Sequence, residues 1–105
     1  MQSHNDSTLD TFLSANPRAI VMFGATWCAP CKALKPKVVK LSEEFSDVAF
    51  AYCSVDDAPE HASTYGISSI PTLVSFRAGQ RMNTLVTSRE ETVREMILAL
   101  TSDAT

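Results

Sequence analysis

The sequence has little of what marks a secreted, membrane or nucleic-acid-binding protein. Its 105 residues include only three cysteines, too few for a disulfide scaffold, and its 45% apolar content can build one core without such bridges. The apolar run 19–23 is far too short to span a bilayer, and no secretory signal precedes it. Nine basic against twelve acidic residues, with no basic cluster, argue against binding to nucleic acid or to an anionic membrane.

These absences favour one independently folding domain over residues 1–105. We expect it to be a monomer in the cytoplasm. A targeting peptide removed on entry into an organelle would leave no trace in this chain.

Hydrophobic periodicity predicts alternating strands and helices. The apolar runs 19–23 and 48–55 are typical of strands buried on both faces of a sheet. Leu34, Val38, Leu41 and Phe45 recur at helical spacing after Cys31, which predicts a long helix there.

Weaker signals complete the pattern. Ser7 is expected to cap a first helix that Pro17 ends, and residues 56–65 form a short helix before Gly66. Residues 71–76 and 80–86 suit an antiparallel hairpin, and Ser88 with Glu91 forms a capping box for a last helix. We therefore predict an α/β fold, with a four- or five-stranded mixed sheet flanked by about four helices.

The segment Trp27-Cys28-Ala29-Pro30-Cys31 indicates thiol chemistry. Cys28 would lie at a helix N-terminus, where free backbone N–H groups and the helix dipole favour the attacking thiolate. Cys31, one turn further, could attack the mixed disulfide once Cys28 has bonded to a substrate sulfur. Pro30 suits the first helical turn because it has no N–H to satisfy. The spacing suits reversible dithiol–disulfide exchange, although a CxxC alone also occurs in metal sites.

The segment 25–32 is followed along the chain by Pro36, Asp56, Tyr65-Gly66-Ile67, Ile70-Pro71-Thr72, and Phe76 with Gly79. In these residues, their order and their spacing, the chain resembles the thioredoxin family over residues 7–101. The resemblance implies a thioredoxin fold and a protein-disulfide reductase in which Cys28 is the nucleophile and Cys31 the resolving cysteine. No cofactor is expected beyond the redox-active disulfide between them.

The resemblance also implies a docking surface and partners. Trp27, Ala29 and Pro30 would form its active turn, Pro71 would be a cis-proline beside the thiols, and the backbone of Ile70 would pair with the substrate chain. Expected substrates are disulfides in proteins such as peroxidases or reductases. The expected electron donor is a protein such as a thioredoxin reductase, which implies a role in electron transport and cell redox homeostasis.

Several positions around the thiols depart from the family pattern, while Lys32 and Pro36 keep it. Met22 stands where a buried Asp is usual, and Tyr52 where its Lys partner is usual. Two interpretations stay open for Met22: Cys31 lacks its usual proton acceptor and resolves more slowly, or Met22 only fills the core. The other departures, which suggest altered partner choice, are Gly24, Ala29 and Thr87.

Two other function classes compete with the reductase. One is a binding or assembly module with secondary redox activity, and the other is a metal or iron–sulfur site made from the paired cysteines of two chains. A zinc site within one chain would need Cys53, His4 or His61, none of which forms a second closely spaced pair. We expect Cys53 to be a core residue and His61 to be solvated.

Overall fold

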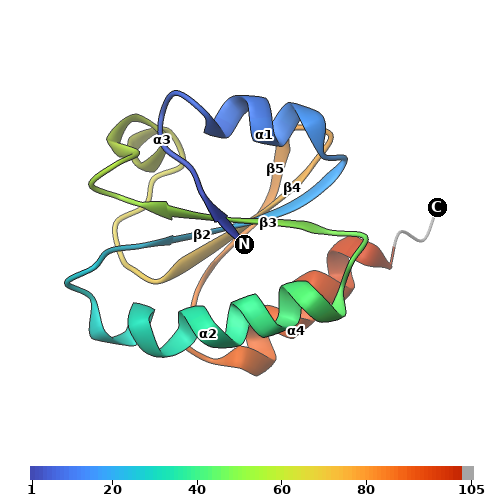
Figure 1. Ribbon diagram of the computed structural model, residues 1–105. Helices are drawn as coiled ribbons and strands as arrows, with labels where there is room; N and C mark the ends of the chain where they lie inside the picture. The colour runs from blue at the N-terminus through green and yellow to red at the C-terminus, as the bar shows by residue number, and fades with distance from the viewer. Residues whose placement is uncertain (103–105) are drawn as a thin grey trace.

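The computed structural model describes residues 1–102 and contains a five-stranded mixed sheet with helices on both faces (Figure 1). Its elements are β1 (Gln2–Ser3), α1 (Leu9–Ala15), β2 (Arg18–Gly24), α2 (Ala29–Glu44), β3 (Ala49–Ser54), α3 (Pro59–Thr64), β4 (Thr72–Arg77), β5 (Gln80–Val86) and α4 (Glu90–Thr101). The strand order is β1-β3-β2-β4-β5. Strands β1, β3 and β2 are parallel to one another. On the other side of β2, β4 pairs antiparallel with β2, and β5 pairs antiparallel with β4. The predicted mixed sheet and hairpin are confirmed.

Strand β2 lies at the centre of the sheet and is buried on both faces, as its unbroken apolar sequence predicts. Successive side chains of a strand point to opposite faces, so β2 contributes to two cores. Ile20 and Met22 join the cluster beneath α2 and α4, whereas Val21 and Phe23 join the cluster on the α1 side. Figure 1 shows α2 and α4 below the sheet and α1 and α3 above it.

Two helix starts differ from the sequence prediction. Ser7 does not cap α1, because its hydroxyl donates to the side-chain oxygen of Asn5 (2.8 Å). Ser88 does not cap α4, which begins after Arg89. The backbone N–H of Arg89 instead donates to the Thr87 hydroxyl oxygen (3.0 Å), so Thr87 holds the turn that enters the helix.

His61 is buried, which corrects the expectation that it is solvated. Its Nδ1 lies 2.6 Å from an Asp6 carboxylate oxygen, and its Nε2 lies 2.9 Å from an Asp10 carboxylate oxygen. Burial alone lowers the pKa of His61, but the hydrogen bonds and charges of the two aspartates outweigh it and raise the pKa. Local pattern could not indicate this cluster, because its members lie more than fifty residues apart.

We expect the stability of the fold to decrease as pH rises through the raised pKa of His61. Protonated His61 donates to both carboxylates, whereas the neutral ring donates to only one. The contribution is complete below the unfolded pKa, about 6.5, and is lost above the folded one. Urea unfolding of wild type and His61→Asn between about pH 5.5 and 8.5 measures it. The slope should disappear in His61→Asn and persist in a His4→Asn control; an unchanged slope in His61→Asn would contradict the assignment.

Candidate active site

The CxxC segment lies where the central strand β2 gives way to α2. Cys28 is the N-cap of α2, and Pro30 occupies the first turn of the helix, as predicted. The backbone N–H of Cys31 donates to the Cys28 sulfur (3.3 Å), so the sulfur takes the place of a capping oxygen. This position sets the positive end of the helix dipole and an N–H donor against Cys28, which favours its thiolate.

Cys28 and Cys31 are joined in a disulfide, with their Cα atoms 5.3 Å apart. Cys28 is 6% exposed and Cys31 is 2% exposed. Of the pair, Cys28 is therefore the more accessible to a second protein. This asymmetry suits attack by Cys28 and a later intramolecular step by Cys31.

The loop before β4 lies against the active turn. The Ile70–Pro71 peptide bond is cis, as the resemblance implies. The Cys28 sulfur lies 3.9 Å from the carbonyl oxygen of Ile70, and the backbone N–H of Thr87 donates to the carbonyl oxygen of Pro71 (3.3 Å). The structure thus brings together three segments that the sequence separates: the CxxC turn, the cis-proline loop and the end of β5.

Trp27 is 67% exposed, so it does not serve as core packing. Its indole Nε1–H donates to a carboxylate oxygen of Asp56 (3.0 Å), which fixes the ring beside the cysteines. Asp56 belongs to the residues that carry the family resemblance, but the sequence pattern assigned it no role. Their separation of 29 positions in the sequence explains why pattern alone did not pair them.

We expect Asp56→Ala to weaken substrate docking more than chemistry. The indole loses its acceptor and its fixed orientation, so KM should rise about threefold to tenfold, the cost of one charge-assisted hydrogen bond. Steady-state reduction of a protein disulfide measures this change. Asp57→Ala, at an exposed neighbouring carboxylate, is the matched control and should keep the wild-type KM. A higher KM in both variants, or in neither, would contradict the role of Asp56.

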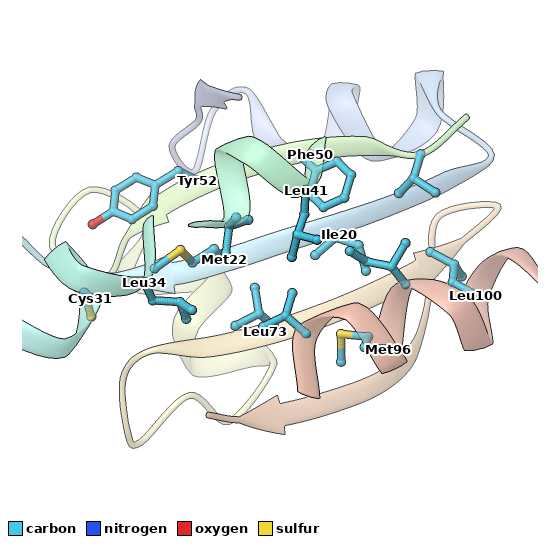
Figure 2. Close-up of a cluster of buried hydrophobic side chains, with 14 of the residues drawn as sticks. Ile20, Met22, Cys31, Leu34, Leu41, Phe50, Tyr52, Leu73, Met96 and Leu100 are labelled. Atoms are coloured by element: carbon cyan, nitrogen blue, oxygen red, sulfur yellow. The ribbon is translucent and has the colours of Figure 1, made fainter. Parts of the chain in front are cut away.

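Met22 and Tyr52 are direct partners on the neighbouring strands β2 and β3. Both belong to the buried cluster that contains Cys31, and Met22 is fully buried. Figure 2 shows the thioether of Met22 between Leu34 and Tyr52, with Cys31 at the same end of the cluster. The position from which a carboxylate would reach Cys31 is therefore filled by an apolar side chain.

The other predicted site residues lie on the surface of α2 or in the core. Ala29, Pro30, Lys32 and Pro36 are exposed on α2. Cys53 is a fully buried free cysteine, as expected, and burial raises its pKa to about 12, so its thiol is unreactive at neutral pH. Within residues 1–102, no group of three or more His, Cys, Asp or Glu side chains is arranged to hold a metal ion. No helix in the same range is long and apolar enough to cross a membrane.

Comparisons with known proteins agree with this geometry. A family model described as Thioredoxin matches residues 1–99. The chain is 32% identical to Thioredoxin-2 of Saccharomyces cerevisiae, over 91% of this chain and 93% of that one. The thioredoxin of Fasciola hepatica superposes with a TM-score of 0.90 at 29% identity, over 95% of this chain and 99% of that one. A chain from a study of thiol resolution in yeast mitochondrial 1-Cys peroxiredoxin by the glutathione and thioredoxin systems superposes with a TM-score of 0.88 at 27% identity, over 95% of each chain.

Proposed function

Because the chain belongs to the thioredoxin family and joins Cys28 to Cys31 in a disulfide, it is a thiol–disulfide oxidoreductase, and we propose that Cys28 attacks and Cys31 resolves. The observation that supports these roles most is the position of Cys28 at the N-terminus of α2. There it is the more exposed sulfur and accepts the Cys31 N–H. The family membership favours neither the assembly module nor the pooled metal site.

The reaction proceeds in two exchanges. The Cys28 thiolate attacks one sulfur of a substrate disulfide, which forms a mixed disulfide and releases the other sulfur as a thiolate. Cys31 loses its proton and attacks the Cys28 sulfur, which forms the Cys28–Cys31 disulfide and releases the second substrate sulfur. The substrate gains two electrons and two protons. An electron donor then reduces the Cys28–Cys31 disulfide.

We assign docking to Trp27, Ala29 and Pro30, which are exposed, and to Ile70, which is partly buried, together with Pro71, whose side chain is buried. Trp27 offers an exposed aromatic face that Asp56 holds in place. The Ile70 carbonyl oxygen, 3.9 Å from the Cys28 sulfur, is an acceptor for a substrate backbone N–H. Gly24, Ala29 and Thr87, which depart from the family pattern, support a choice of partners different from that of a typical member.

We propose that the substrates are disulfides in proteins such as peroxidases or reductases. The similarity to the chain from the yeast mitochondrial peroxiredoxin study supports a peroxidase partner. The electron donor is a protein such as a thioredoxin reductase. The chain works as a monomer in the cytoplasm and uses no cofactor besides its cysteine pair. A net charge of −3 without a basic cluster supports proteins, rather than nucleic acid or membrane, as partners.

Insulin reduction with NADPH and a thioredoxin reductase tests this function. The protein should accelerate insulin precipitation, and NADPH oxidation should stop when insulin disulfides are exhausted. A peroxidase supplied with peroxide in place of insulin tests the proposed partner class. If the reduced protein left insulin disulfides intact, even with dithiothreitol as donor, the oxidoreductase roles of the two cysteines would be wrong.

A further inference from the structure

Tyr52 and Cys31 approach each other across the position of Gly24. A side-chain carbon placed on Gly24 would lie 3.0 Å from the Tyr52 hydroxyl oxygen and 3.2 Å from the Cys31 sulfur. Because both distances are measured from one point, the oxygen and the sulfur are at most 6.2 Å apart. A single water molecule can bridge two polar atoms at such a separation. A side chain at Gly24 would press on both groups, so glycine lets Tyr52 and Cys31 pack this close to the end of β2.

A cavity of about 160 Å³ lies beside these two groups. Its lining residues are Ala25, Thr26, Cys31, Lys32, Lys35 and Tyr52. At roughly 30 Å³ per molecule, the volume is sufficient for several waters, and the hydroxyl and ammonium groups of the lining can hold them. The cavity therefore sets Cys31 beside polar side chains, with room for water.

Lys35 places a positive charge in the same cavity. It lies one helical turn after Cys31 on the same face of α2, and its Nζ is 3.9 Å from the centre of the Tyr52 ring. Burial, with the charges of Asp57, Cys53 and Asp56, raises the pKa of Tyr52, so its hydroxyl stays protonated at neutral pH. The titratable groups that line the cavity with Cys31 are Lys32 and Lys35 from α2 and Tyr52 from β3, whereas Cys53, Asp56 and Asp57 act electrostatically on Tyr52.

We propose that water in this cavity, oriented by the Tyr52 hydroxyl, takes the proton from Cys31 during the resolving step, in place of the buried carboxylate that Met22 excludes. This inference rests on the proposed function, because it assigns a helper to the resolving cysteine. Tyr52 acts through water on the reacting sulfur and is a positioning and proton-relay residue. The three departures from the family pattern at Met22, Gly24 and Tyr52 then serve one purpose, the deprotonation of Cys31 without a carboxylate.

Protons and electrons balance in this relay. The Cys31 thiol gives its proton to a cavity water, which the Tyr52 hydroxyl orients, and the hydroxyl then donates a hydrogen bond toward the thiolate. The thiolate forms a bond with the Cys28 sulfur, and the bond between Cys28 and the substrate sulfur breaks. The electron pair of that bond leaves on the substrate sulfur, which is reduced. The proton passes through water to this leaving thiolate, and Tyr52 ends neutral, as it began. Lys35 stabilises the negative charge while it is on Cys31.

Single-turnover reduction of a fluorescent peptide disulfide, quenched with acid at successive times, separates the two exchanges. Tyr52→Phe keeps the ring under Lys35 and removes only the hydroxyl. We expect its resolving step at pH 7 to be about tenfold slower, the loss typical of a hydrogen bond to an ionised group, while mixed-disulfide formation is unchanged. The deficit should shrink toward pH 9.5, because Cys31 then ionises without help. A packing defect would slow the step equally at every pH.

Two lysines on α2 provide a second test and its matched control. Lys35→Met should slow the resolving step about threefold, the size of a charge–charge interaction at a partly exposed site. Lys37→Met removes the same charge from an exposed position of the same helix and should leave the rate unchanged. A wild-type resolving rate in Tyr52→Phe, or a deficit independent of pH, would overturn the relay. Failure of the proposed function is distinct, because then no mixed disulfide would form in the first exchange.

Discussion

Cys28→Ser is expected to reduce turnover of protein disulfides by about a thousandfold or more, because the hydroxyl that replaces the thiol is not ionised at neutral pH. Cys31→Ser also abolishes turnover, but it leaves the first exchange intact. The mixed disulfide between Cys28 and the substrate then has no internal thiol to resolve it and should accumulate. Nonreducing electrophoresis and mass spectrometry of the trapped complex measure the difference between the two variants.

Cys53→Ser is the control for this experiment, since Cys53 is buried on β3 and remote from the exchange. It should keep wild-type turnover and trap nothing, whatever it does to stability. Turnover that survived in Cys28→Ser, or a complex trapped by that variant in place of Cys31→Ser, would reverse the assigned roles.

Met22→Asp is expected to destabilise the fold by about 3–5 kcal/mol, the typical cost of an uncompensated buried charge. Met22 is fully buried on the central strand, and its direct partner on β3 is Tyr52, which offers no positive charge. Burial would raise the pKa of the new carboxyl above its unfolded value. The loss should therefore be smallest at acidic pH, where the carboxyl is neutral, and should grow as pH rises through the unfolded pKa, about 3.9.

Urea unfolding of the reduced protein at several pH values measures this cost. Met22→Leu, which conserves volume, should cost less than about 1.5 kcal/mol and show no added pH dependence. The double variant Met22→Asp with Tyr52→Lys should recover part of the loss, because it supplies the partner charge. A Met22→Asp variant as stable as wild type would mean that water or a positive charge already reaches this position.

The sequence was most informative where chemistry and periodicity depend on near neighbours. The CxxC spacing placed Cys28 at a helix N-terminus and Pro30 in its first turn, and the structure has both. The apolar run 19–23 identified the central strand because a strand covered on both faces has no polar alternation. Resemblance to the thioredoxin family supplied Pro71 and its cis bond, which local pattern alone would not have given.

Features that depend on distant segments were missed. We predicted that His61 is solvated, because its hydrogen-bond partners Asp6 and Asp10 lie far away in the sequence, in the N-terminal region. The role of Asp56 depended on the orientation of the Trp27 indole. The sequence could not indicate a role for the Tyr52 hydroxyl, because its closeness to Gly24 and Cys31 depends on the register between β2 and β3. The predicted caps Ser7 and Ser88 each lie one position before the observed ones, Thr8 and Arg89. Ser7 donates to Asn5, and the Arg89 N–H donates to Thr87.

The distinct roles of Cys28 and Cys31 are tested most directly by the rate of iodoacetamide alkylation of the reduced protein as a function of pH, with the modified cysteine identified by peptide mapping. The position of Cys28 at the start of α2 predicts that it alkylates first, with an apparent pKa below the value of about 8.5 for a free thiol. Cys31 should react much more slowly. Alkylation of Cys31 before Cys28, or a Cys28 pKa at or above that of a free thiol, would contradict the assignment of Cys28 as the attacking thiolate.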